Sequence, residues 1–173
     1  MLKIKVENGG KFVSRWLGVR FAALPARIEG RGIRLRHTLA RGGNFKFSRC
    51  PICYRIEKTD GAGKKFRPMG FIGLYNLDLR QSAEIAVEIV EVERGKGTGG
   101  VILGLFLDQC LRHAIAEEMF ARVRPDNEAA LRLFKRKKFD SNGETPGPDG
   151  FLIFKLRLAL PPDKAETETI KGE

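Results

Sequence analysis

Apolar and polar residues alternate along several short segments of the chain, whereas in three other segments the apolar residues recur at helical spacing. Alternation with period two predicts strands, and recurrence at every third or fourth residue predicts helices. The predicted strands are Leu2–Glu7, Ile33–Leu39, Ile52–Glu57, Met69–Leu77, Glu84–Val92, Met119–Val123 and Phe151–Leu158. The predicted helices are Phe12–Leu24, a long helix from Val101 to Ala114, and a third that Pro125-Asp126-Asn127 opens and Phe139 closes. Strands outnumber helices and one long helix crosses between two of them, so we expect a mixed α/β sheet.

The chain has the length and composition of one globular domain. It has 173 residues, 42% of them hydrophobic and 31% charged, and no apolar run long enough to span a bilayer. We expect a single domain over residues 1–160, followed by a disordered tail over 161–173. The first residues do not resemble a secretory leader, and three cysteines do not make a disulfide framework. These features favour a cytoplasmic protein without a membrane contact.

Positive charge is concentrated at the N-terminal end. The net charge of the chain is +11, and residues 1–50 hold twelve Lys and Arg side chains against two Glu side chains, a surplus of ten. A positive field on one segment favours a polyanionic partner, so we expect contact with nucleic acid or the ribosome through these residues. The alternative is a solvated face that keeps the protein soluble, because no nucleic-acid-binding motif accompanies the charge.

A glycine-rich turn lies between the predicted strand Glu84–Val92 and the long helix. Its glycines have no Cβ and adopt positive φ easily, and its backbone N–H groups lie at the positive end of the helix, where a diphosphate binds well. Arg94 and Lys96 add positive charge. The turn lacks the Gly-Lys-Ser/Thr of a mononucleotide loop, and its glycines recur at every second residue from Gly95 to Gly99, which we interpret as different from a dinucleotide-binding loop. A turn without any ligand is the alternative. The glycines are Gly95, Gly97, Gly99 and Gly100.

The pattern Arg94-x-x-Gly97-x-Gly99 between a strand and a helix resembles the coenzyme A pyrophosphate loop of the GNAT superfamily of N-acetyltransferases. A second similarity follows at Asn127, Ala130, Leu131, Leu133 and Phe139, although Phe134 stands where the superfamily usually has Tyr and Lys138 where it usually has Gly. The resemblance covers residues 69–158. It implies a mostly antiparallel central sheet of about six to seven strands flanked by helices, with a basic N-terminal part (1–65) and a cofactor-binding core (66–158).

The resemblance also implies a cofactor and its contacts. The cofactor would be acetyl-CoA or another acyl-CoA, its pyrophosphate held by Arg94–Gly100 and its thioester arm paired with Val87–Val90 like an added strand. Asn127 is often a cofactor contact in relatives, although its position suits a plain helix N-cap equally well. The cofactor-binding residues that we expect are Val87, Ile89, Val90, Arg94, Gly95, Lys96, Gly97, Thr98, Gly99, Gly100, Asn127 and Phe134.

Transfer to an amine requires a neutral acceptor nitrogen, so a carboxylate that takes its proton is a sensible component. Glu88 is our first candidate, because it is closest to where the superfamily's acetyl group lies, and Glu84 is the second. Two solvent-facing strand carboxylates are the alternative. Tyr at the position of Phe134 can protonate the leaving thiolate in relatives, and Phe lacks that donor. The resemblance therefore implies an acyl-CoA-dependent N-acyltransferase, most simply an acetyltransferase, whose acceptor amine is anionic or nucleic-acid-associated. The alternative is a CoA-binding or nucleic-acid-binding module on the same fold that lost the chemistry.

Cys50, Cys53, Cys110 and His113 have the spacing of a four-residue zinc set. Cys110 lies on the apolar stripe of the long helix, where a small core residue explains it better. We therefore predict no metal site. His37 is expected to be a half-buried strand residue, because no ligand or base partner lies near it in the sequence.

Overall fold

The computed structural model describes residues 4–7, 11–16, 19–20, 24–38, 52–60, 65–76, 82–113, 115–141, 143 and 145–158, with side chains from residue 24 onward. The expected tail over 161–173, Cys50 and the end of the predicted strand at Leu39 lie outside these residues. None of the helices in the described ranges is long and apolar enough to cross a membrane.

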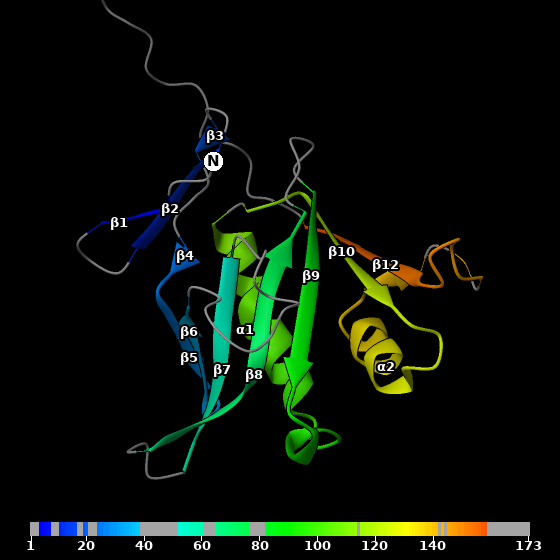
Figure 1. The fold of residues 1–173 in the computed structure, drawn as a ribbon, viewed down its shortest axis with the longest axis horizontal. Helices are drawn as coiled ribbons and strands as arrows, with labels where there is room; N and C mark the ends of the chain where they lie inside the picture. The colour runs from blue at the N-terminus through cyan, green and yellow to red at the C-terminus, as the bar shows by residue number, and fades with distance from the viewer. Residues whose placement is uncertain are drawn as a thin grey trace, which may run out of the picture.

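An eight-stranded mixed sheet forms the body of the molecule (Figure 1). Its order is β11-β12-β10-β9-β8-β7-β6-β5, and every neighbouring pair is antiparallel except β9 and β10. The fold class is as predicted, but the sheet has more strands than the six to seven expected. The strands are β5 (Arg27–Gly30), β6 (Ile33–His37), β7 (Ile52–Thr59), β8 (Phe66–Tyr75), β9 (Ser82–Ile89), β10 (Glu118–Val123), β11 (Asp140–Ser141) and β12 (Leu152–Arg157).

One extra strand, β5, arises from a tight hairpin. Arg31 and Gly32 have φ of 51° and 74°, the backbone of a two-residue turn that matches the twist of the strands it joins. The hydrophobic pattern missed β5 because Ile28 is its only large apolar side chain. The predicted pairing of Ile52–Glu57 with Met69–Leu77 is confirmed by β7 and β8.

The prediction of a helix over Phe12–Leu24 is wrong. The chain there forms short strands that pair among themselves in a separate small sheet. The segment is rich in aromatic and β-branched residues, which favour an extended backbone, and Gly18 lowers helix propensity near its middle. The expected opening strand is confirmed. The strands are β1 (Ile4–Glu7), β2 (Lys11–Trp16), β3 (Val19–Arg20) and β4 (Leu24–Pro25).

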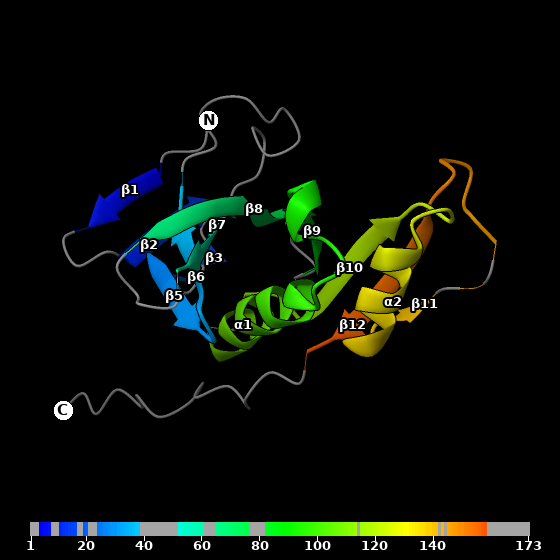
Figure 2. The same ribbon diagram turned by 90° about the horizontal axis from the view of Figure 1, so that it is seen from below.

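The two helices, α1 (Thr98–Arg112) and α2 (Glu128–Arg136), pack against each other, and α1 runs along one face of the central strands (Figure 2). Helix α1 connects β9 to β10. Because these two strands are parallel, the chain must cross from the end of one to the start of the other, and a helix usually makes this crossover. On the face toward α1, the buried Tyr54 ring contacts Phe106 edge to face, and its hydroxyl donates to the Pro25 carbonyl at 2.5 Å. The buried phenol is therefore paired rather than isolated in the core.

Gly70 allows β8 and β9 to approach closely. Its φ is 151°, and a Cβ built on it would lie 1.8 Å from the Glu88 carbonyl oxygen. We expect Gly70→Ala to lower the free energy of unfolding by ~3 kcal/mol, because the backbone of β9 must move. Urea denaturation measures this change. Gly150→Ala is the control, since Gly150 has φ of 77° with nothing near its built Cβ, and should cost only ~1 kcal/mol. Equal losses would contradict the steric explanation.

Candidate active site

Strands β9 and β10 pair over only three residues and then separate. Their register joins Ser82 with Glu118, Ala83 with Met119 and Glu84 with Phe120. Beyond Glu84, β9 continues to Ile89 beside β8, and β10 continues to Val123 beside β12. The facing edges of the two strands therefore present main-chain donors and acceptors to an extended ligand.

The predicted strand Glu84–Val92 ends earlier than expected, at Ile89. Val90 donates a last main-chain hydrogen bond to Met69 O at 2.7 Å. Glu91–Glu93 then forms a single 3-10 turn, η2. The alternating pattern continued through Val92, but this side chain is 69% exposed, whereas Glu93 is buried. The strand is followed by a turn in which the charged Glu93 side chain is buried, which the pattern of hydrophobicity could not indicate.

The glycine turn has the geometry that an anion site requires. Gly95 and Gly97 have φ of 74° and 75°, and no atom lies within 4 Å of a Cβ built on either. Gly97 is the N-cap of α1, and no side chain caps the helix there. The first N–H groups of α1 are therefore uncapped by side chains and border open space. A Cβ on Gly99 would lie 3.5 Å from Ile89 and Leu133, so this glycine lets α1 pack closely.

A cavity of about 390 Å³ runs from this turn along α1. Its lining includes Gly97, Gly100 and Gly104 of the turn and helix, with the cations Arg31 and Lys137. Arg94 instead folds back, and its Nε donates to Ile89 O at 2.8 Å. The turn thus joins β9 to α1 beside a solvent-accessible hollow.

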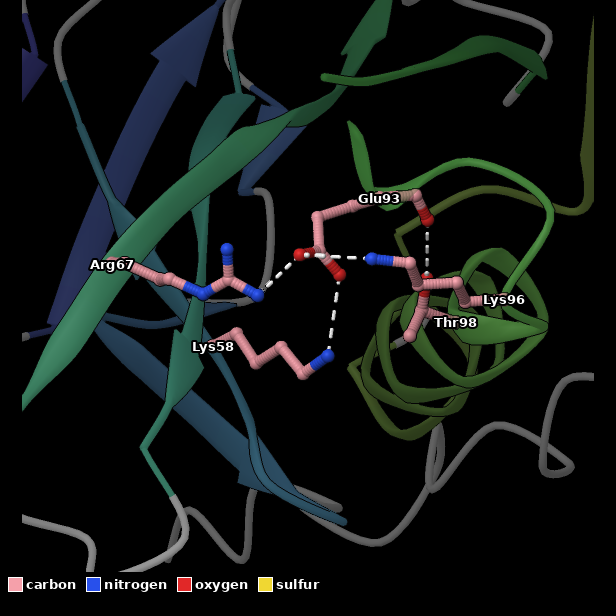
Figure 3. A network of polar contacts seen from close by, with 5 residues as sticks. All are labelled: Lys58, Arg67, Glu93, Lys96 and Thr98. Carbon is pink, nitrogen blue, oxygen red and sulfur yellow. Dashed lines mark hydrogen bonds and ion pairs between the residues drawn. The ribbon is translucent and has the colours of Figure 1, made fainter. Parts of the chain in front are cut away.

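Glu93, which the sequence analysis did not single out, is a buried carboxylate next to the glycine turn. Its side chain is 1% exposed and lies among cations from three different segments (Figure 3). Lys58 Nζ lies 3.2 Å from Oε2, Lys96 Nζ lies 3.5 Å from Oε1, and Arg67 also binds Oε1. Burial raises the pKa of Glu93, but hydrogen bonds from Lys58 and Arg67 outweigh it and hold the pKa below its usual value. The carboxylate is therefore charged at neutral pH.

The two candidate bases, Glu84 and Glu88, lie on the same face of β9 but have different surroundings. Glu84 is 8% exposed and accepts hydrogen bonds from Asn76 Nδ2 at 2.7 Å and Arg122 Nε at 2.9 Å. Because both its oxygens accept from other side chains, Glu84 suits a structural role where β9 and β10 separate. Glu88 is half-buried, lies further along the separated part of β9 and is opposite Phe71 of β8.

Asn127 and Phe134 lie on α2. The Asn127 side chain accepts from Ala130 N at 3.1 Å, so it is the helix N-cap. Phe134 is 4% exposed, with its ring centroid 5.1 Å from that of Phe139 and 6.2 Å from that of Phe154. Phe134 therefore packs in an aromatic cluster and has no proton to donate.

The remaining candidates have structural explanations. Cys53 and Cys110 are buried free thiols, and burial raises the pKa of Cys110. Within the described residues, no group of three His, Cys, Asp or Glu side chains is arranged to hold a metal ion. His37 is half-buried in β6, as predicted, and burial lowers its pKa to about 4.

The described part of the basic segment is largely paired with acids. Arg27 binds Glu29, while Arg34 and Arg36 both bind Glu57. Arg31 instead lines the cavity along α1. Contact of this segment with nucleic acid or the ribosome stays a prediction.

Comparisons with known proteins agree with this geometry. The model of the acetyltransferase (GNAT) family matches residues 34–139, more than half of the chain. Similar solved structures include a Methanocaldococcus jannaschii domain (20% identity, TM-score 0.54, covering 62% of this chain and 66% of that one). Another is a Vibrio cholerae spermidine N-acetyltransferase in complex with CoA and spermine (16%, 0.52, 62% and 65%). A third is a Vibrio fischeri ribosomal-protein-S5-alanine acetyltransferase (9%, 0.61, 77% and 97%).

The chain spans just under two thirds of the first two of these structures. At these identities the similarity is one of fold. No curated protein matches the sequence significantly.

Proposed function

The chain belongs to the acetyltransferase (GNAT) family, and from this membership we propose that it transfers an acetyl group from acetyl-CoA to an amine. The observation that carries the proposal is the combination of two separated strands with an uncapped helix N-terminus at the end of one of them. The turn around Gly97 would hold the diphosphate, and the open edge of β9 at Val87–Val90 would pair with the pantetheine arm.

The cofactor would supply an acetyl thioester, and this chain would supply orientation and a base. The chemistry supplied there would be attack of the amine nitrogen on the thioester carbonyl carbon, which would form the C–N bond and break the C–S bond, with the thiolate as the leaving group. Glu88 would accept the proton of the amine, directly or through one water. Phe134 has no hydroxyl, so water would protonate the thiolate; a thiol has a pKa near 8.5, and its thiolate is a tolerable leaving group.

For the acceptor, we propose an amine that is anionic or is presented by an anionic partner such as nucleic acid or a ribosomal particle. The surplus of ten positive charges in residues 1–50 supports this class. A module that binds coenzyme A without turnover is the second candidate, and the apolar ring of Phe134 favours it.

Thiol release from acetyl-CoA in the presence of amines, polynucleotides and ribosomal fractions separates these two functions. For the enzyme, we expect release above the uncatalysed rate with at least one acceptor, together with acetylated product detected by mass spectrometry. Binding of acetyl-CoA with no turnover on any acceptor would favour the module. Absence of acetyl-CoA binding would contradict both.

A further inference from the structure

The strands β7 and β8 extend beyond the end of β9 and bring cations to the glycine turn. The last pair of β8 with β9 joins Gly70 to Ile89, so Phe66–Met69 of β8 lies past the end of β9. Lys58 and Thr59 of β7 pair with this part of β8. We call Lys58–Thr59 with Phe66–Met69 the β7–β8 arm (Figure 1).

Ion pairs of Glu93 connect this arm to the turn. Lys58 and Arg67 reach its carboxylate from the arm, and Lys96 reaches it from the turn between Gly95 and Gly97 (Figure 3). The Thr98 hydroxyl, at the start of α1, donates to the Glu93 carbonyl oxygen at 3.4 Å. The buried carboxylate thereby joins the arm to the turn, and the main-chain carbonyl of the same residue contacts the start of the helix.

The charges in this cluster do not balance. Three cations surround one carboxylate, which leaves two positive charges in surplus where one partner would suffice to neutralise Glu93. Arg67 and Lys96 are 58% and 53% exposed, and each has donors beyond those that contact Glu93. An additional anion at this place would therefore be attracted without displacing Glu93.

We propose that the β7–β8 arm is a second phosphate-binding element, in which Arg67 and Lys58 contact a phosphate of the cofactor's nucleotide and Glu93 is the positioning residue that holds them beside the turn. The inference rests on the proposed function, because the phosphate belongs to acyl-CoA. A guanidinium with donors on two edges suits a phosphate oxygen pair, whereas lysine acts as a point charge. The phosphate is either the diphosphate or the 3′-phosphate.

Calorimetric titration of the protein over residues 1–173 with CoA and with 3′-dephospho-CoA tests the proposal. We expect Arg67→Gln to weaken CoA binding about tenfold, the change typical of losing one charge-assisted contact, and Arg67→Lys to retain most of the affinity. The loss in Arg67→Gln should shrink as salt concentration rises, because screening removes the same interaction. If the loss disappears with dephospho-CoA, the 3′-phosphate is the contact; if it persists, the diphosphate is.

Arg112→Gln is the matched control, since Arg112 is an exposed arginine that binds one acid, Asp108, at the other end of α1. It should change CoA affinity less than twofold. A double-mutant cycle with Glu93→Gln separates a phosphate contact from mere neutralisation of Glu93. If Arg67 binds phosphate, Arg67→Gln weakens CoA binding in the Glu93→Gln protein as well.

Arg67→Gln without effect on CoA affinity in the Glu93→Gln protein would overturn the proposal, because Arg67 would then only neutralise the carboxylate. If Glu93→Gln does not fold, the comparison of Arg67→Gln with Arg112→Gln decides, and equal affinities overturn the proposal. Failure of cofactor binding itself is distinct, since the unaltered protein would then not bind CoA at all, and a protein that binds CoA without acetyl transfer leaves this test unchanged.

Discussion

Gly97→Val should weaken acetyl-CoA binding by about 30-fold or more. A β-branched residue is strongly disfavoured at φ of 75°, and the strain there costs at least ~2 kcal/mol. The turn would relieve this strain by changing its backbone conformation, and its N–H groups would then no longer point toward the proposed phosphate position. The valine side chain would also occupy the open space beside Gly97, where we propose that the diphosphate binds. Titration calorimetry with acetyl-CoA measures the loss.

Gly150→Val is the control for backbone strain. Gly150 has φ of 77° and nothing within 4 Å of its built Cβ, so valine there is strained in the same way. Both variants should lose comparable stability on thermal unfolding, but only Gly97→Val should lose affinity. Equal affinity in both variants would show that the turn does not bind the cofactor.

Glu88→Gln is expected to lower kcat by about 100-fold at neutral pH while the KM for acetyl-CoA changes little. Glutamine keeps the shape of the side chain but cannot accept the proton of the amine, and general base catalysis typically contributes 10²–10⁴-fold. The remaining activity should rise tenfold per pH unit up to the pKa of the acceptor amine, because only the amine already deprotonated in solution then reacts. Initial rates over a pH series measure both effects.

Glu91→Gln, an equivalent change at an exposed position just beyond β9, should leave kcat and the pH profile unchanged. Glu84→Gln should mainly lower stability, because glutamine keeps only one acceptor oxygen for Arg122 and Asn76 and lacks the charge that pairs with Arg122. If the Glu88→Gln protein has a normal kcat and pH profile, Glu88 is not the general base and another group accepts the proton of the amine.

The site elements that are local in sequence could be predicted, and those that depend on distant partners could not. The turn from Arg94 to Gly100 combines a change of hydrophobic period with glycines, and both signals lie within a few residues of each other. The cap at Asn127 is equally local. Glu93 had no such signal, because its partners Lys58 and Arg67 lie 35 and 26 residues away and only strand pairing brings them together.

The prediction of a helix over Phe12–Leu24 failed for a different reason. The apolar residues of this segment fit helical spacing and strand alternation about equally well, and the preference of its aromatic and β-branched residues for strands is too weak and context-dependent to decide between them. Strand pairing, which the spacing of residues does not report, formed β2, β3 and β4 there. In the core, Tyr54, Phe106 and Phe154 are buried where periodicity alone would place them.

The short pairing of β9 with β10 has a consequence for cooperativity. Within the described sheet, β5–β9 and β10–β12 are joined by three residue pairs, the crossover helix, the Arg122–Glu84 contact and a shared hydrophobic core. Because few main-chain hydrogen bonds connect them, we expect the β9–β10 boundary to open more readily than the rest of the sheet in local unfolding. A ligand that contacts both sides of this boundary would couple them through linkage, so saturation with acetyl-CoA should suppress this local opening.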